Sequence, residues 1–428
     1  MTTNRVGYEP VSVKTVLAEM KDTAELLIDL SYSAVLLGDE ALAAEVVALE
    51  ERMDVLQMQA RMSLMMAARS PDDAEALAPV LGVVGAAEKI SDAAGDIAKV
   101  VLEDVGLPDA MRAALPEAIE TLVRADVDEG SPLAGVSLGE SNLETATGVR
   151  VIAVHGPGRK STASGVDTDE DGWQLNPDHE TVFRPGEAVI LRGSEDGIER
   201  VYERLTGEPY DPPEPVDYDI DDLERAVDSI VLMKNTSELA VDLAYGSVLF
   251  DSADVAREVV ELEAEVDALK ARFEAWTLRA AARFEDPISL RGLVHLAAST
   301  EIISDAAVEI SEGVLRGLGT HPVIAEAVYE SDEVIVRLSV APGTRLDGTT
   351  LGYPPIKSET GMWVIGVRQV DGNGDSDRDG DDDGRSIDEG WVLSPGPETR
   401  LSAGDVVLAK GTRSGAERLA DLAGVDLD

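Results

Sequence analysis

The stretch MKDTAELLIDLSYSAVLLGD, residues 20–39, recurs 213 positions later as MKNTSELAVDLAYGSVLFDS, residues 233–252. The shift aligns Asp29 with Asp242 and Tyr32 with Tyr245. Self-similarity at a fixed spacing decides the architecture before any local pattern is considered. The chain is therefore two tandem copies of one module.

The similarity extends through most of each copy. The aligned acidic pairs are Glu50 with Glu263, Asp54 with Asp267, Glu88 with Glu301, and Asp92 with Asp305. Towards the end of each copy the shift becomes 218, which aligns Trp173 with Trp391 and Gly193 with Gly411. The second copy therefore has five more residues in one loop.

Each copy changes character halfway. The first half has apolar residues at spacings of three and four, as in VLAEMKDTAELLIDLSYSAVLL, which predicts three or four amphipathic helices. The second half has short β-branched runs such as TLVRADV, VRVIAV and AVILRG, separated by glycine, which predict strands. A short helix, IERVYERL or AERLADLA, closes each copy. The predicted class is α+β and multidomain, with helical bundles alternating with small, mostly antiparallel α+β domains.

Two families resemble these halves. The helical halves resemble PhoU, whose helices carry an E-x-x-x-D motif on the inner face of a bundle; here the motif reads EERMD, EKISD, EAEVD and EIISD. The strand-rich halves resemble the TrkA C-terminal domain, also called the RCK C-terminal domain, through SPLAGVSLGE, WQLNPDHETVFRPGEAVIL and their second-copy counterparts TRLDGTTLGY and WVLSPGPETRLSAGDVVL. The resemblance implies PhoU-like domains at 1–115 and 219–328, TrkA-C-like domains at 116–208 and 329–428, and a Pro-rich acidic linker at 209–218.

TrkA-type potassium regulators normally carry a Rossmann domain ahead of this module. No G-x-G-x-x-G follows a predicted strand here, and HGPGRKS at His155 lacks the glycine before the lysine of a phosphate loop. Dinucleotide binding of the Rossmann kind is not expected.

Composition excludes several classes of protein. The net charge of -48 disfavours nucleic acid, since no basic stripe is present to release counterions. Cysteine is absent, which excludes disulfides and thiolate chemistry, and the four histidines show no catalytic spacing, so an enzyme is not expected. So large a negative charge would repel itself strongly in dilute buffer, whereas molar salt shortens the screening length to roughly 3 Å. The charge therefore favours a protein from a halophile. With no signal peptide and no apolar span of ~20 residues, we expect a cytoplasmic protein, peripheral to the membrane through a transport subunit.

Acidic residues form stripes on the predicted helices. Glu88, Asp92 and Asp96 lie at i, i+4 and i+8, among small and apolar residues. The family resemblance implies divalent or iron cations in the helical bundles. The candidate metal ligands are Glu50, Asp54, Glu88, Asp92, Asp96, Glu263, Asp267, Glu301, Asp305 and Glu309. The alternative is a solvated or protein-paired acidic face.

Other residues also have two interpretations. The loop at 371–383, VDGNGDSDRDGDDDG with its flanks, alternates acidic residues as a calcium loop does, but Ser386 stands where the bidentate glutamate belongs. It is either a solvated acidic insert or a weak cation site. Trp173 and Trp391 fit a domain core better than a ligand cage, and Tyr32 and Tyr245 fit the bundle core.

These features favour a regulatory, ligand-sensing protein of potassium or related cation transport. The expected partners are a separate membrane transporter or channel subunit and a small ligand such as a nucleotide, a cyclic dinucleotide or a cation. A homodimer or an internal pseudo-dimer of TrkA-C-like domains is expected. The alternative is a PhoU-like metal-binding regulator of phosphate transport and homeostasis, and a metal-dependent hydrolase is a more distant third.

Overall fold

The computed structural model describes residues 12–108, 121–159, 172–212, 220–284, 286–318, 321–353, 356–370 and 391–427. The backbone divides into two compact units. The first comprises residues 1–143 and 149–331, and the second comprises residues 144–148 and 332–428. The five-part division predicted from the sequence stays a prediction.

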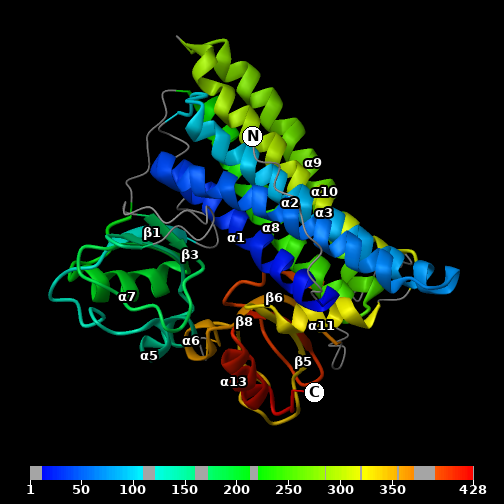
Figure 1. The fold of residues 1–428 in the computed structure, drawn as a ribbon. Coiled ribbons are helices and arrows are strands. Elements are labelled where there is room, and N and C mark those ends of the chain that lie inside the picture. The colour runs from blue at the N-terminus through cyan, green and yellow to red at the C-terminus, as the bar shows by residue number, and fades with distance from the viewer. Residues whose placement is uncertain are drawn as a thin grey trace, which may run out of the picture. The chain divides into compact units, whose positions relative to one another are not determined.

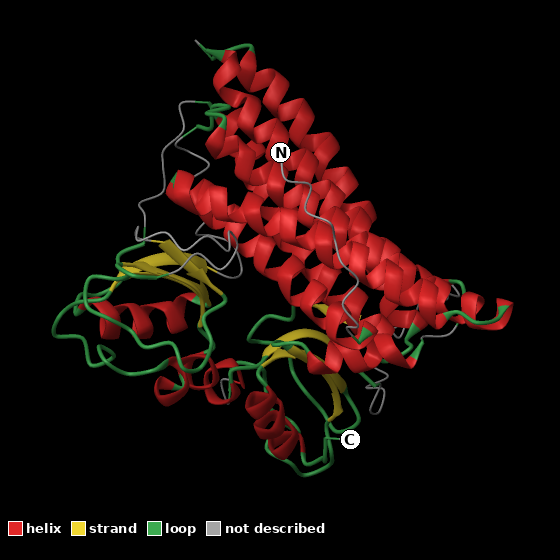
Figure 2. Ribbon diagram, viewed as in Figure 1, coloured by secondary structure: helices red, strands yellow, loops and turns green. Residues whose placement is uncertain are grey.

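Long helices dominate the first unit (Figures 1 and 2). The first copy contributes α1 (Val13–Leu37), α2 (Glu40–Ala67) and α3 (Pro71–Leu102). The second contributes α8 (Asp221–Leu249), α9 (Ala253–Ala281), the 3-10 turn η2 (Pro287–Leu290) and α10 (Arg291–Leu315), followed by the shorter α11 (Pro322–Glu330). The described residues thus contain three long helices per copy, within the predicted three or four.

Local sequence explains where the helices begin and end. Gly38 adopts a left-handed φ of 61° after α1, and Asp39 then caps α2 by accepting a hydrogen bond from the Leu42 amide at 2.9 Å. Ser70 caps α3, and Pro71 takes the first helical position, where the missing N–H costs nothing. The chain therefore passes from α2 to α3 over residues 68–70.

The two copies pack through their third helices. The α3 helix contacts α1 and α2 of its own copy and α10 of the other, and α10 in turn contacts α8 and α9. Two side chains cross between the copies with matching geometry. Lys21 Nζ lies 5.4 Å from the Tyr245 ring centroid, and Lys234 Nζ lies 5.3 Å from the Tyr32 ring centroid. Because 234 aligns with 21 and 245 with 32, the two helical halves form an internal pseudo-dimer in which the same contact occurs twice.

A four-stranded antiparallel sheet completes the first unit. Its strands are β1 (Thr121–Asp126), β2 (Arg150–Gly156), β3 (Gly172–Leu175) and β4 (Ala188–Gly193), in the spatial order β1-β4-β2-β3. The amphipathic helix α7 (Glu195–Thr206) buries Ile198, Val201 and Leu205, which cluster with β-strand residues. A short helix, α5 (Leu138–Ser141), precedes β2. The predicted strands and closing helix are confirmed.

This sheet is joined to α1 by a buried ion pair. Arg192 Nη1, on β4, donates to Asp29 Oδ2 at 2.5 Å, and both side chains are 8% exposed. Nearby, Arg124 Nη1 on β1 lies 3.9 Å from Asp39 Oδ2 before α2. The helical bundle and the sheet of the first copy therefore share charged contacts as well as apolar packing.

The second unit repeats the small fold. Strands β5 (Val334–Ser339), β6 (Trp363–Arg368), β7 (Trp391–Leu393) and β8 (Val406–Gly411) take the order β5-β8-β6-β7, with short α12 (Ile356–Thr360) and closing α13 (Arg413–Ala423). The β2–β4 ladder shifts register between Val151 and Ala153, and the β6–β8 ladder does so between Val364 and Gly366, 213 positions on. The duplication thus preserves even a β-irregularity.

Residues 144–148 belong to the second unit although they follow the first copy's α5. They include most of α6 (Leu143–Thr147). Thr145 Oγ1 lies 3.2 Å from Thr412 Oγ1 and 3.1 Å from Ser414 Oγ, at the start of α13. The Arg418 guanidinium donates to the Thr145 carbonyl at 3.4 Å.

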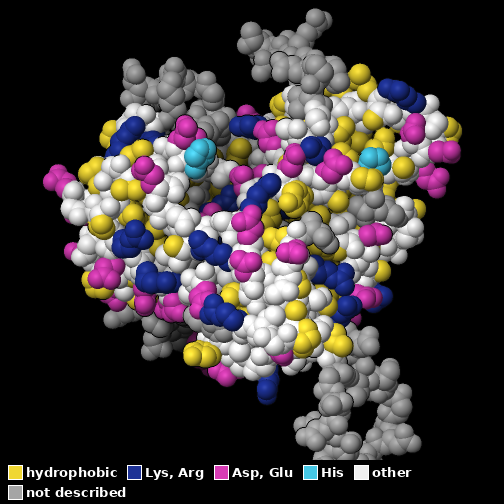
Figure 3. All heavy atoms as spheres, turned by 90° about the horizontal axis from the view of Figure 1, so that it is seen from below, with side chains coloured by type: hydrophobic (Ala, Val, Ile, Leu, Met, Phe, Trp, Pro, Cys, Tyr) yellow, Lys and Arg dark blue, Asp and Glu magenta, His cyan; other side chains and the backbone are white. Residues whose placement is uncertain are grey.

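On the face drawn in Figure 3, the described Lys and Arg side chains are interspersed with acidic ones and form no continuous basic stripe. Among the described residues, no helix is long and apolar enough to cross a membrane.

Candidate functional site

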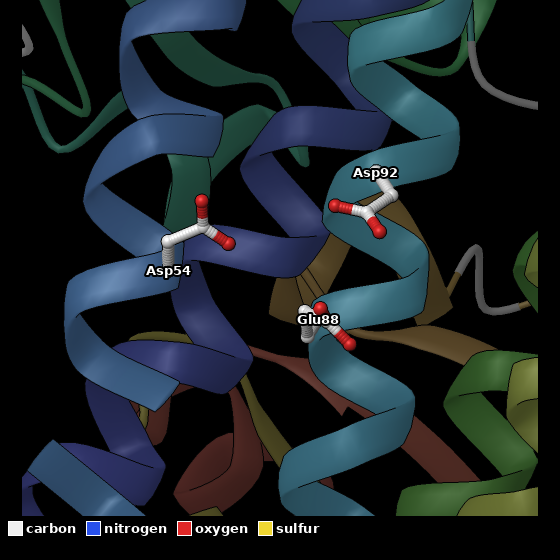
Figure 4. A group of neighbouring side chains, drawn as sticks. All are labelled: Asp54, Glu88 and Asp92. Carbon is white, nitrogen blue, oxygen red and sulfur yellow. The ribbon is translucent and has the colours of Figure 1, made fainter. Parts of the chain in front are cut away.

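Three carboxylates converge between α2 and α3 of the first copy. Figure 4 shows Asp54 projecting from α2 toward α3, which carries Glu88 and Asp92. One carboxylate oxygen of each residue lies within 4.8 Å of the other two. Because residues four apart share a helix face, Glu88 and Asp92 meet Asp54 together. None of the three forms an ion pair with another described residue.

Glu50 and Asp96 flank this trio. The Glu50 carboxylate lies against Gly95 of α3, so closely that a Cβ on that glycine would be 1.9 Å from Glu50 Oε2. This oxygen is buried and has no hydrogen-bond partner among the described residues. Lys99 Nζ is 3.8 Å from Glu50 Oε1 and 2.9 Å from Asp96 Oδ1. Asp96 is therefore paired with a lysine at the edge of the cluster.

The pKa values of Glu88, Asp92 and Glu50 are raised. Burial raises the pKa of Glu88, the Asp92 charge adds to the rise, and Arg61 opposes it. The pKa of Asp92 is raised by burial and then by Asp54. Burial also raises the pKa of Glu50, with Lys99 opposing. Like charges this close favour proton uptake or a bound cation.

The second copy gathers the aligned carboxylates but adds a lysine. Burial raises the pKa of Glu263, and Asp267, Asp305 and Glu301 add to the rise, so the four carboxylates lie close enough to interact. Lys270 Nζ, on α9, is 2.8 Å from Glu301 Oε2.

The last predicted ligand of the second copy is engaged elsewhere. Glu309 of α10 pairs with Lys89 of α3. Lys89 and Lys270 both lower the pKa of Asp305, against the larger effects of burial and of Glu301. Among the described residues, the structure brings Asp54, Glu88 and Asp92 together with Glu50 beside them, and it places Asp96 and Glu309 in pairs with lysines. In the second copy, Asp267, Asp305 and Glu301 act electrostatically on Glu263.

The donor set of the first cluster consists of carboxylate oxygens alone. Such a set suits hard cations such as Mg²⁺, Mn²⁺ or Ca²⁺, and carboxylates also bind iron. The unpartnered Glu50 oxygen and the glycine that makes room for it fit a cation held near the trio. The acidic loop at 371–383 lies outside the described residues.

The tryptophans and tyrosines singled out from the sequence are core residues. Trp173 is 2% exposed, with its ring centroid 4.9 Å from that of His155, and Trp391 is 9% exposed. Tyr32 and Tyr245 are buried, and the Tyr32 hydroxyl lies 2.6 Å from Thr300 Oγ1. These predictions are confirmed.

Sequence reasoning missed Lys270 and the Asp29–Arg192 pair. The repeat alignment contained the signal for Lys270. Position 270 aligns with position 57, and a lysine in the second copy therefore replaces the Gln57 of the first. The pairing of Asp29 with Arg192 had no such signal, since 163 residues separate them.

Comparisons with known proteins agree with this architecture. The PhoU domain model matches residues 17–101 and 230–314, and the TrkA-C domain model matches residues 122–206. No curated protein matches the chain.

Among solved structures, PhoU from Pseudomonas aeruginosa aligns at 14% identity and a TM-score of 0.38, over 71% of this chain and 96% of that one. The GsuK RCK domain aligns at 14% identity and a TM-score of 0.17, over 71% of this chain and 63% of that one. The GsuK channel bound to NAD aligns at 14% identity and a TM-score of 0.17, over 71% and 53%.

The second small module is outside the matched ranges but repeats the strand order of the first. The chain belongs to the PhoU and TrkA-C domain families, with two tandem PhoU domains alternating with small α+β TrkA-C domains.

Proposed function

We propose that this chain is a ligand-sensing regulator of potassium or related cation transport, acting in the cytoplasm on a separate membrane subunit. The observation that carries the proposal is the joining of a TrkA-C domain to a PhoU bundle by the buried Asp29–Arg192 pair. A ligand that moves the sheet would also move α1, because the buried Asp29–Arg192 pair connects β4 to that helix. Neither domain family is catalytic, which favours regulation over an enzymatic role.

The proposed mechanism is a population shift. A ligand can bias the helical bundle only by its difference in affinity for two arrangements of the module. We expect the TrkA-C-like modules to work as a pair, formed either within one chain or between two chains. A nucleotide, a cyclic dinucleotide or a cation held at such a pair would stabilise one arrangement.

The test is a thermal-shift screen of the full chain in molar KCl. The probes are ATP, NAD, cyclic di-AMP, K⁺ and Mg²⁺, each followed by hydrogen exchange where it raises the melting temperature. A ligand at a hundredfold excess over its Kd stabilises by about 2.7 kcal/mol. Protection is expected at residues 121–206 and 332–427. Protection confined to α1–α3 and α8–α10 would contradict the proposal and favour the second candidate.

The second candidate is a metal-binding regulator of phosphate transport, favoured by the converging Asp54, Glu88 and Asp92. We propose that these residues, with Glu50 beside them, hold a divalent or iron cation in the first bundle. Elemental analysis of chain purified without chelator tests this. A metal-free chain whose melting temperature ignores added Mn²⁺ and Fe²⁺ would contradict the site.

A further inference from the structure

The two acidic clusters differ at one central position. Glu88 and Glu301 occupy the same place in their copies, and the residue that faces them from the neighbouring helix is Gln57 in one and Lys270 in the other. Glu50, Asp54 and Asp92 have carboxylate counterparts in the second copy. The exchange of a neutral amide for an ammonium therefore places a cation against the central glutamate of the second copy.

Lys270 is placed as a cation of the second cluster. Its Nζ is 2.8 Å from Glu301 Oε2, and both side chains are about three-quarters buried, at 27% and 23% exposure. Its charge also acts on Asp305. Lys89 reaches the same cluster from α3, where it pairs with Glu309. Two ammonium groups thus offset the second cluster.

Gln57 leaves the first cluster without a cation at its centre. Its side chain is 7% exposed and lies beside Glu88. Lys99 pairs with the flanking Glu50 and Asp96, and its charge also acts on Asp92. Arg61 lowers the pKa of Glu88 and Lys99 lowers that of Asp92, each against the larger effect of burial, but among the described residues neither forms an ion pair with Asp54, Glu88 or Asp92.

A second difference acts in the same direction. Gly95 lets the Glu50 carboxylate lie against α3, whereas the aligned residue on α10 is Val308. Gly in a helix interior costs about 1 kcal/mol relative to Ala, so a helix keeps it only where space is needed. The first cluster has room for a carboxylate at this point, and the second does not have that glycine.

We propose that Lys270 permanently occupies the place of the cation in the second bundle, so that the chain binds one hard divalent cation, in the first bundle only. This inference rests on the metal site proposed above. An ammonium at 2.8 Å from the central glutamate would repel a divalent ion and withdraw one of its ligands. The second copy then carries its own cation at the place where its twin takes up metal.

The experiment measures Mn²⁺ bound per full-length chain. Protein stripped with chelator is dialysed against Mn²⁺ and assayed by elemental analysis. Wild type is expected to bind one ion, Lys270→Gln two, Gln57→Lys none, and the double exchange Gln57→Lys with Lys270→Gln one. Lys270→Arg, which keeps the charge, is the matched control and is expected to bind one.

A second measurement does not depend on metal. In chelator and low salt, Lys270→Gln is expected to lower the melting temperature, because four carboxylates lose a counterion, and Gln57→Lys is expected to raise it. The inference would be overturned if wild type bound two ions, or if wild type and Lys270→Gln each bound one. Either result would leave the first site intact. Wild type without Mn²⁺ would overturn the proposed metal site and, with it, this inference.

Discussion

The two copies of the helical module keep the same core and differ at their acidic clusters. Lys21 Nζ lies 5.4 Å from the Tyr245 ring centroid, and Lys234 Nζ lies 5.3 Å from the Tyr32 ring centroid, so the two contacts between the copies are nearly identical. The position that faces the central glutamate, in contrast, is Gln57 in one copy and Lys270 in the other. Packing between copies constrains both partners at once, whereas a cluster within one copy can change alone.

The largest expected effect concerns the attachment of the first small module. Arg192→Met would remove the guanidinium that pairs with the buried Asp29 carboxylate, and breaking a buried pair typically costs about 3–5 kcal/mol. Chemical denaturation of the full chain measures the change. The second copy has Lys410 at the aligned position, so Arg192→Lys sharpens the comparison and is expected to cost less.

The double variant Asp29→Leu with Arg192→Met is the control for that experiment. Replacing a whole buried pair by apolar residues is often neutral, so it should recover much of the lost stability. A double variant as unstable as the sum of the single variants would show that the two residues are not coupled.

Gly95→Val gives the first copy the residue of the second. The added Cβ would meet Glu50 Oε2 and force the carboxylate away. Affinity for Mn²⁺, measured by calorimetry, is expected to fall roughly 10–100-fold, the range typical of a disturbed metal environment. Val308→Gly is the reciprocal control, expected to lower stability slightly without changing Mn²⁺ affinity. Unchanged affinity in Gly95→Val would remove Glu50 from the site.

A hydroxyl pair tests the core of the pseudo-dimer. Tyr32 bonds to Thr300, but Tyr245 has no hydrogen-bond partner among the described residues, because Ala87 stands at the position that aligns with Thr300. Thr300→Ala is expected to cost about 1–2 kcal/mol in thermal unfolding by leaving the Tyr32 hydroxyl unsatisfied. Ala87→Thr should raise stability by up to about 1 kcal/mol; a loss instead would show that the site has no space for the hydroxyl.

The smallest effect is a pH dependence of the metal-free chain. The pKa of Asp92 and of Glu88 is raised above the ordinary 3.8 and 4.5, so the folded state holds these protons to higher pH than the unfolded state. Their contribution to stability therefore falls as pH rises from these values through the raised folded values. Asp92→Asn should flatten this slope and add about 0.5 kcal/mol at pH 7, the scale of a like-charge pair on a helix.

Asp305→Asn is the matched variant in the second copy. Two lysines, Lys270 and Lys89, act on Asp305, whereas only one, Lys99, acts on Asp92, so the gain should be smaller. Equal gains in thermal melts at pH 7 would mean that the two clusters carry the same repulsion and that the lysine has no electrostatic role.

Much of the fold was predictable because its signals are local. Helix periodicity located α1–α3 and α8–α10, and the strand pattern located β1 and β5. The convergence of Asp54 with Glu88 and Asp92 was predictable in part, since spacing places Glu88 and Asp92 on one face and the PhoU resemblance named Glu50 and Asp54 as further ligands. Which of these two α2 residues lies closer to Glu88 and Asp92 could not be predicted. That depends on the register between two helices, which side-chain packing sets.

The sequence by itself determined the duplication, the alternation of helical and strand-rich halves, and the net charge of -48; the halophilic origin that this charge suggests stays a prediction. Tertiary structure alone decided that Lys270 pairs with Glu301, that Glu50 lies against Gly95, and that Arg192 reaches Asp29. Periodicity and composition are properties of neighbours along the chain. Whether a charge in so acidic a protein is solvated, paired or left for a cation depends on which helix faces it, and that is set only when the helices pack.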